Sequence, residues 1–184
     1  MNIIEETIYQ HADSYRNAII AARNDGRFIG DLCFDRFPIG CCGDASDMLA
    51  AHLLEKGIKT IWYSACRENH QSHAWLVLDD ARISKPTPSF SYLPKEIQPI
   101  MRGYGVANPD AAIDITHYEA ENLCDGLIID ITGDQFIDYS IPVFVGQADE
   151  FHSNFEFFQA HDYNGLTSRL EKLYRIVEEY IDSR

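Results

Sequence analysis

Apolar side chains recur at helical spacing near both ends of the chain. Over residues 3 to 22 the apolar positions are Ile4, Ile8, Ala12, Tyr15, Ile19 and Ile20, and the pattern stops near Asn24-Asp25-Gly26. In the last 20 residues they are Leu166, Leu170, Leu173, Val177 and Tyr180. Ser168 and Glu171 have the spacing of a capping box. We therefore expect one helix at each end of the chain.

A third helix is predicted directly after a loop. The loop is RFPIGCCG at 36–43, where Pro38 and Gly40 exclude regular structure. The following DASDMLAAHLLEKG has an apolar stripe and then Gly57, the residue type that commonly ends a helix. The stripe consists of Ala45, Met48, Leu49 and Leu53. The first turn of this helix should lie at or just after Cys42.

Four short runs are typical of β-strands: residues 59–65, 73–79, 126–131 and 141–146. The run 73–79 is apolar throughout its middle and should be a central strand. Pro142 near the start of the last run suits an edge strand. With three helices around a run of strands, we expect an α+β fold in which helices pack on an antiparallel sheet.

The remaining segments show no sustained periodicity. Residues 80–125 hold most of the seven prolines and are too long for an ordinary connection, so we predict an insertion that serves as a lid or a substrate-binding flap. Residues 147–163 are rich in aromatic side chains and are expected to be irregular and to cover the core. A length of 184 residues favours one domain over 1–184, with the insertion at about 80–125.

The charge of the chain narrows the choice of partners. The formal net charge is −14, so phosphates are repelled, and neither nucleic acid nor an anionic membrane surface is an expected partner. Neutral or cationic substrates suit this charge better. No apolar run approaches the roughly 20 residues of a membrane span, and MNIIEETIYQ lacks the basic start of a signal peptide. We expect a cytoplasmic protein.

The five cysteines do not suggest a disulfide framework, because their number is odd and no secretory signal is visible. There is no CxxC pair, so a zinc ribbon or thioredoxin-type site is unsupported, and we expect no metal and no cofactor. Cys41 is interpreted as a packing residue. Structural roles are expected for Cys33, Cys66 and Cys124.

Cys42 is the candidate nucleophile. A thiolate is favoured by a helix N-terminus and by a nearby imidazole, and Cys42 begins the predicted third helix. The free N–H groups of that first turn would also suit the oxyanion of a tetrahedral intermediate. Asp44 and Asp47 in the same region oppose the thiolate by charge repulsion.

His73 and Asp130 are the candidate base and its orienting acid. His73 opens the strand 73–79 and shares a face with Trp75, which we interpret as core beside the site in preference to a substrate platform. If the strands 73–79 and 126–131 are antiparallel neighbours, Asp130 lies next to His73 and fixes its tautomer. Asp134 and Gln135 are alternatives for the orienting role. His70 is an alternative base, and His52 on the third helix is expected to be exposed.

Three sequence motifs together resemble a known superfamily. GCCGD before a helix resembles the Gly-x-Cys-x-Asp of transglutaminase-like proteins, HAWLVLD their His-Ala-Trp strand, and LIIDIT their Asp-x-Thr strand. The order Cys, His, Asp is also that of papain-like cysteine enzymes. The resemblance covers roughly half of the chain, and its long insertion departs from the family pattern, as does the lack of a clear glutamine before Cys42.

The resemblance implies a papain/transglutaminase-like fold with the triad Cys42, His73 and Asp130. It implies acyl transfer through a thioester: a peptidase, an amidase or deamidase, or a transglutaminase, acting on a protein, a peptide or a small amide. Whether water or an amine accepts the acyl group stays open, as does the oligomeric state. The alternatives are a non-catalytic binding module on the same fold and a metal site built from Cys41, Cys42 and His73. A thiol-reactive probe distinguishes the enzyme from these.

Overall fold

The computed structural model describes residues 3–87, 89–92, 94–103, 110, 113–114, 118–123 and 125–182. Three long helices have the predicted positions: α1 (Ile3–Asn24), α2 (Cys42–Glu55) and α6 (Ser168–Asp182). The shorter helical segments are η1 (Phe34–Arg36), η2 (Glu68–His70), α3 (Gln98–Gly103), α4 (Ala120–Leu123), η3 (Gly133–Gln135) and α5 (Glu150–Ser153). No helix among the described residues is both long and apolar enough to cross a membrane.

The main sheet has five strands, and all its pairings are antiparallel. Their order is β6 (Phe144–Gly146), β5 (Ile128–Asp130), β2 (Gln71–Leu78), β1 (Thr60–Arg67) and β7 (Glu156–Asp162). The α+β class is thus confirmed, with β2 central and β6 at an edge as predicted. The expectation of an irregular segment over 147–163 is wrong in part, because this segment contains α5 and the edge strand β7.

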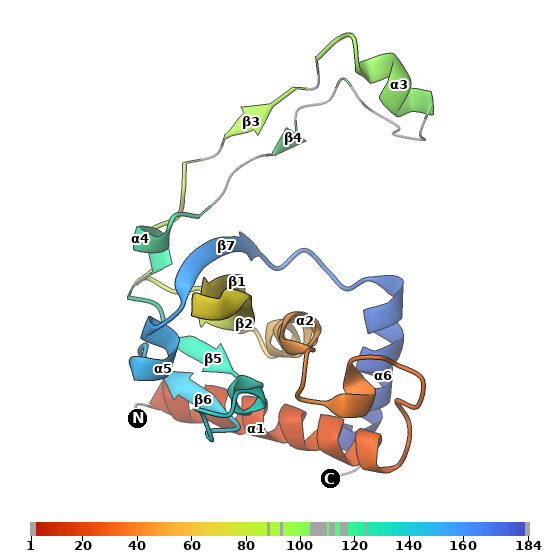
Figure 1. The fold of residues 1–184 in the computed structure, drawn as a ribbon, viewed down its shortest axis with the longest axis vertical. Coiled ribbons are helices and arrows are strands. Elements are labelled where there is room, and N and C mark those ends of the chain that lie inside the picture. Colours follow the sequence, from red (N-terminus) through yellow and green to blue (C-terminus); the bar gives the residue numbers. More distant parts are fainter. Residues whose placement is uncertain are drawn as a thin grey trace.

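The two faces of the sheet are covered by different elements (Figure 1). Along β2, Leu76 and Leu78 point into a core shared with α1, α2 and α6. The alternate residues Trp75 and Val77 point into a second core that contains Phe151 of α5 and Leu123 of α4. This period-two alternation gives the sheet two apolar faces, and it places His73 on the face covered by α5.

Two predicted details of the helices are wrong. His52 is 1% exposed instead of lying on the surface: its ring packs on Tyr15, and its Nδ1 lies 3.0 Å from Glu178 Oε1 on α6. The start of α6 uses Thr167 instead of a capping box at Ser168. The N–H of Glu171 donates to the Thr167 carbonyl oxygen, and the N–H of Leu170 donates to Thr167 Oγ1.

The two ends of the segment 80–125 pack in the second core through Ile83, Tyr118 and Leu123. The described residues between them project away from the sheet as an arm (Figure 1). Its strands β3 (Phe90–Ser91) and β4 (Ile113–Asp114) pair antiparallel. The arm begins after the C-terminal end of β2, whereas His73 lies near the opposite end. Its root is held by Lys85 and Tyr118, whose side chains contact each other at 2.8 Å and both contact Asp162 at the end of β7.

Candidate active site

Cys42 is the first residue of α2 and is half-buried. The preceding N-cap residue, Cys41, makes no side-chain cap hydrogen bond, so the N–H groups of the first turn are not occupied by that side chain. Cys41 itself is 2% exposed, and its Sγ donates to the Pro38 carbonyl oxygen at 3.3 Å. Burial, together with the neighbouring Cys42, raises the pKa of the Cys41 thiol far above its ordinary value. The two adjacent cysteines therefore differ in chemistry, and Cys42 is the reactive candidate.

The structure brings His73 and Asp130 together by strand register. Strands β2 and β5 are antiparallel neighbours, with Leu76 opposite Ile129. His73 Nε2 lies 2.7 Å from Asp130 Oδ2, and both side chains are almost completely buried. Nε2 is thus occupied by Asp130, which leaves Nδ1 for other partners, among them Gln135 Nε2 at 3.2 Å. The predicted arrangement of these two strands is confirmed.

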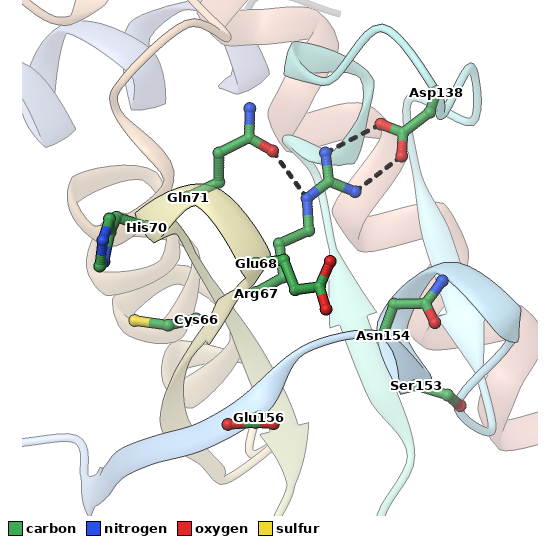
Figure 2. A pocket seen from close by; sticks show the side chains of 9 residues that line it. All are labelled: Cys66, Arg67, Glu68, His70, Gln71, Asp138, Ser153, Asn154 and Glu156. Atoms are coloured by element: carbon green, nitrogen blue, oxygen red, sulfur yellow. Dashed lines mark hydrogen bonds and ion pairs between the residues drawn. The ribbon is translucent and has the colours of Figure 1, made fainter.

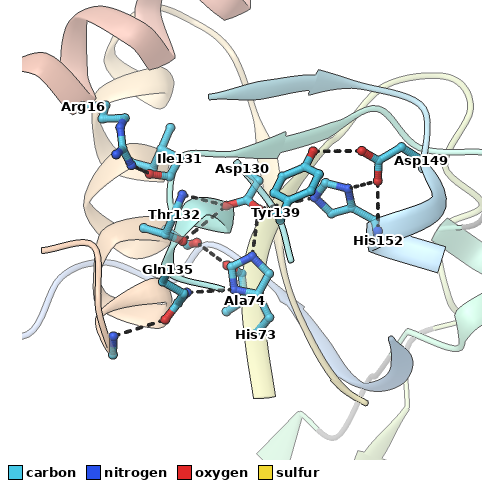
Figure 3. Close-up of polar contacts among 12 residues, drawn as sticks. Arg16, His73, Ala74, Asp130, Ile131, Thr132, Gln135, Tyr139, Asp149 and His152 are labelled. Carbon is cyan, nitrogen blue, oxygen red and sulfur yellow. Dashed lines mark hydrogen bonds and ion pairs between the residues drawn. The ribbon is translucent and has the colours of Figure 1, made fainter. Parts of the chain in front are cut away.

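Asp130 is held by four hydrogen-bonding contacts (Figure 3). Its Oδ1 accepts from the Thr132 N–H at 2.8 Å and from Thr132 Oγ1 at 3.2 Å, while its Oδ2 contacts His73 and, at 3.3 Å, His152 Nε2. Burial raises the pKa of this carboxyl, but the His73 charge and the hydrogen bond from His152 outweigh it and bring the pKa well below its usual range. Asp130 is accordingly an anion without exposure to water.

The electrostatics of His73 and Cys42 favour an ion pair. Burial lowers the pKa of His73, but the charge and hydrogen bond of Asp130, followed by those of Cys42, raise it to about 9. Burial raises the pKa of Cys42, but the hydrogen bond and charge of His73 outweigh this, with further contributions from the Ala74 backbone and Gln135, so the net pKa is lowered. At neutral pH these directions favour a thiolate next to an imidazolium.

Gln135 links the histidine to the loop before Cys42. Its Nε2 lies 3.2 Å from His73 Nδ1, and its Oε1 accepts from the Gly40 N–H at 3.1 Å (Figure 3). Gln135 therefore contacts the histidine on the side opposite Asp130 and does not replace that acid. The other alternative, Asp134, forms an ion pair with Arg16 instead: its Oδ2 lies 2.7 Å from Arg16 Nη2.

Arg16 is a supporting residue that the sequence did not indicate. It lies on α1, is 6% exposed, and also donates to the carbonyl oxygen of Ile131. With the ion pair to Asp134, it connects α1 to the turn that follows β5. That turn carries Gln135, so Arg16 helps to fix the position of Gln135. Nothing in the spacing of Arg16 along α1 connects it to residues more than a hundred positions away.

An aromatic layer covers the histidine. Trp75 is 3% exposed and its ring centroid is 5.3 Å from that of His73, which agrees with a core position beside the site. Phe136, Phe155 and Phe151 contact the same imidazole at 5.1, 5.7 and 6.0 Å between centroids. These rings shield the His73–Asp130 pair from water, which strengthens its charge interactions.

A second histidine lies behind Asp130, and sequence reasoning gave it no role. His152 on α5 is 3% exposed, and its Nδ1 lies 2.6 Å from Asp149 Oδ1 (Figure 3). Asp149 also caps α5 by accepting from the His152 N–H, and it accepts from the Tyr139 hydroxyl at 2.8 Å. The only signal in the sequence is the Asp-x-x-His spacing of a helix cap, which does not point to Asp130.

A polar hollow of about 830 Å³ adjoins the site (Figure 2). It is lined by Cys66, Arg67, Glu68, His70, Gln71, Asp138, Ser153, Asn154 and Glu156. The Arg67 guanidinium forms an ion pair with Asp138 at 2.7 Å and lies over the Phe136 ring at 4.7 Å. Phe136 also contacts His73, at 5.1 Å between ring centroids, so this ring links the lining of the hollow to the imidazole.

The other candidate residues lie apart from this constellation. His70 is exposed, Cys66 lines the hollow, Cys33 is half-buried, and Cys124 lies outside the described residues. Within the described part of the chain, no three His, Cys, Asp or Glu side chains are grouped so as to hold a metal ion.

No protein-family model, no curated protein and no solved structure matches this chain. The assignment of the candidate site therefore rests on the geometry and electrostatics of its own residues.

Proposed function

We propose that this protein is a thiol-dependent acyl-transfer enzyme with a papain/transglutaminase-like fold, in which Cys42, His73 and Asp130 form the triad. One observation carries the proposal. Cys42, at the start of α2, lies close enough to His73 for each to shift the pKa of the other, and His73 Nε2 lies 2.7 Å from a buried carboxylate. A nucleophile, its base and an orienting acid in this order are what acyl transfer through a thioester requires.

Each residue has a defined role in the proposed reaction. The Cys42 thiolate attacks the carbonyl carbon of an amide, and the electron pair of the C=O bond moves to the oxygen. The proposed donors to that oxyanion are N–H groups of the first turn of α2 and the Gln135 side-chain amide. His73 Nδ1–H then protonates the leaving nitrogen, the C–N bond breaks, and a thioester on Cys42 remains. Asp130 keeps the His73 ring in the required tautomer.

The second half of the reaction uses the same groups. His73 accepts a proton from the incoming nucleophile, which attacks the thioester, and Cys42 leaves as the thiolate. With water as the nucleophile the reaction is amide hydrolysis or deamidation, and with an amine it is transamidation. The proposed substrate is an amide in a protein, a peptide or a small molecule. The chain's net charge of −14 favours neutral or cationic ones.

The test measures the rate at which iodoacetamide alkylates Cys42 from about pH 4 to about pH 10, read by peptide mass spectrometry. Because the Cys42 pKa is lowered and the His73 pKa is raised to about 9, the ion pair should exist from the lowered Cys42 pKa up to about pH 9. We expect a first rise in rate well below the free thiol pKa of about 8.5 and a second near pH 9, as His73 loses its proton. In His73→Ala the first rise should disappear.

The matched control is His70→Asn, which changes an exposed histidine near the site and keeps a residue type that tolerates its positive φ of 59°. It should retain both rises. If wild-type Cys42 titrates as an ordinary thiol and His73→Ala behaves identically, no activated nucleophile exists. The triad proposal would then be wrong, and a non-catalytic binding module would be the better interpretation.

A further inference from the structure

His152 lies between two carboxylates in the interior of the protein. Its Nε2 is 3.3 Å from Asp130 Oδ2, and its Nδ1 is 2.6 Å from Asp149 Oδ1. The ring is packed against Phe144 and Trp75, at 4.6 and 5.3 Å between centroids, and the residue is 3% exposed. No exposed surface of the ring is available for water to supply a missing hydrogen bond.

The protonation of His152 follows from its partners. Asp130 accepts from Thr132 and faces His73, and Asp149 accepts from the His152 N–H and the Tyr139 hydroxyl. In both carboxyls, hydrogen bonds and the charge of the neighbouring histidine outweigh the effect of burial and lower the pKa, so both are ionised at neutral pH and act only as acceptors. A ring nitrogen without a proton would face a carboxylate oxygen as one acceptor against another. Only the imidazolium, with a proton on each nitrogen, satisfies both contacts.

We propose that His152 is a buried imidazolium and a positioning residue, which acts through Asp130 to set the pH at which His73 gives up its proton. This inference rests on the proposed function, because it concerns the same site. The alternating order His73, Asp130, His152, Asp149 forms one line of hydrogen bonds from β2 through β5 to α5 (Figure 3). His152 does not contact Cys42 or a reacting atom, and its effect is electrostatic.

The direction of the effect follows from the charges. Asp130 attracts the His73 proton, whereas a positive charge on His152, across the same carboxylate, repels it. His152 thus limits how strongly Asp130 holds the proton that His73 must release to the leaving group. Asp149 opposes this in part, but it lies on the far side of His152 and is more distant from His73. Among the described residues, the other titratable side chain hydrogen-bonded to Asp149 is Tyr139, whose hydroxyl donates to this carboxylate.

Two variants test the charge separately from the hydrogen bond. His152→Gln retains an N–H donor for Asp130 but no charge, and Asp149→Asn removes the anion that holds the proton on Nδ1. The second rise of the Cys42 alkylation profile, which reports the loss of the His73 proton, should move to higher pH in both. The shift should be roughly one pH unit in His152→Gln, and smaller in Asp149→Asn because one distant negative charge is lost as well.

Phe144→Leu is the matched control, since it loosens the packing on the His152 ring without changing any charge. It should leave the second rise in place. Folding of each variant is checked by circular dichroism. If His152→Gln does not fold, Asp149→Asn together with ¹⁵N NMR of the wild-type histidine rings decides the matter. In those spectra both ring nitrogens of His152 should carry a proton at neutral pH.

Three results would overturn the inference: a bare nitrogen on the His152 ring, a second rise that does not move or moves to lower pH, or an equal shift in Phe144→Leu. All three are recorded on a protein whose wild-type profile has both rises. An absent first rise in the wild type instead contradicts the proposed function itself. The two failures are therefore distinguishable.

Discussion

Gly133 occupies a position next to the site where a side chain does not fit. A Cβ atom built on it would lie 2.8 Å from Asp130 Oδ2 and 2.7 Å from Tyr139 Cδ1. The turn after β5 must pass this close to the carboxylate, because it carries Thr132 and Gln135 to their contacts with Asp130 and His73. The absence of a side chain is thus a requirement of the site's geometry.

Gly133→Ala should therefore destabilise the protein, by about 1–3 kcal/mol in the free energy of unfolding, as overpacking in a dense interior does. Urea unfolding measures the change. The matched control is Gly43→Ala in α2, where a Cβ would make an ordinary contact at 3.6 Å with Trp62. This control should be neutral or stabilising by up to about 1 kcal/mol, as expected for alanine in place of glycine in a helix. Equal effects of the two substitutions would contradict the steric argument.

The residues that the sequence could predict are those linked by strand register. Cys42 begins α2 and Asp130 ends β5, while His73 is the third residue of β2 and does not open its strand as expected. The antiparallel pairing of β2 and β5 is enough to bring His73 and Asp130 together. His152 and Arg16 reach the site from α5 and α1 by packing. A stripe of apolar residues predicts which face of a helix is buried, but it does not show which residues that face contacts. Gln135 was considered only as a substitute for Asp130, and its contact with Gly40 depends on how two loops meet.

At the scale of elements, α6 is tied to the loop before Cys42 and to the first turn of α2. Arg169, in the first turn of α6, reaches Asp44 in the first turn of α2 with its Nη1 at 2.7 Å. Its Nε and Nη2 each lie 2.9 Å from Asp31 in the loop that leads to Cys42. The guanidinium thus offsets the charge of Asp44, which is only two residues from the nucleophile and would otherwise oppose a thiolate.

Arg169→Ala should move the first rise of the Cys42 alkylation profile to higher pH, because Asp44 then repels the thiolate without an opposing charge. The shift should be a few tenths of a pH unit, and the loss of stability at most about 1 kcal/mol, since Arg169 is partly exposed to solvent. Arg175→Ala, an exposed arginine on the same helix, is the control and should change neither quantity. An unchanged profile in Arg169→Ala would show that Asp44 has no influence on Cys42.

The elements themselves were predictable where the core imposes a period. The three long helices and four of the five strands of the main sheet match the predicted stretches, because each buries a regular face. Strand β7 was missed because only Ala160 within it is buried. Its register against β1 also shifts between Ser64 and Ala65. An exposed edge strand with a bulge has no alternation to detect.

At the scale of the whole molecule, the arm and the candidate site lie at opposite ends of β2. The chain enters the arm after Leu78, whereas His73 is near the beginning of the strand. The contacts among Lys85, Tyr118 and Asp162 join both sides of the arm's root to β7. With its two sides tied together at the root, the arm has little mechanical influence on the rest of the sheet, and its length should be variable without cost to the site.

Replacement of residues 86–117 by a short glycine-serine linker between Lys85 and Tyr118 tests this separation. Lys85 Nζ and Tyr118 Oη lie 2.8 Å apart, so the two backbones are within the combined reach of these side chains, which a flexible linker of about eight residues spans. We expect both rises of the Cys42 alkylation profile to be unchanged, because His73 lies near the opposite end of β2 from the root of the arm. Lys85→Met in the intact chain is the control that weakens the root alone. If the shortened chain folds but its Cys42 loses activation, and Lys85→Met does not, the arm takes part in the site and the predicted flap is the correct interpretation.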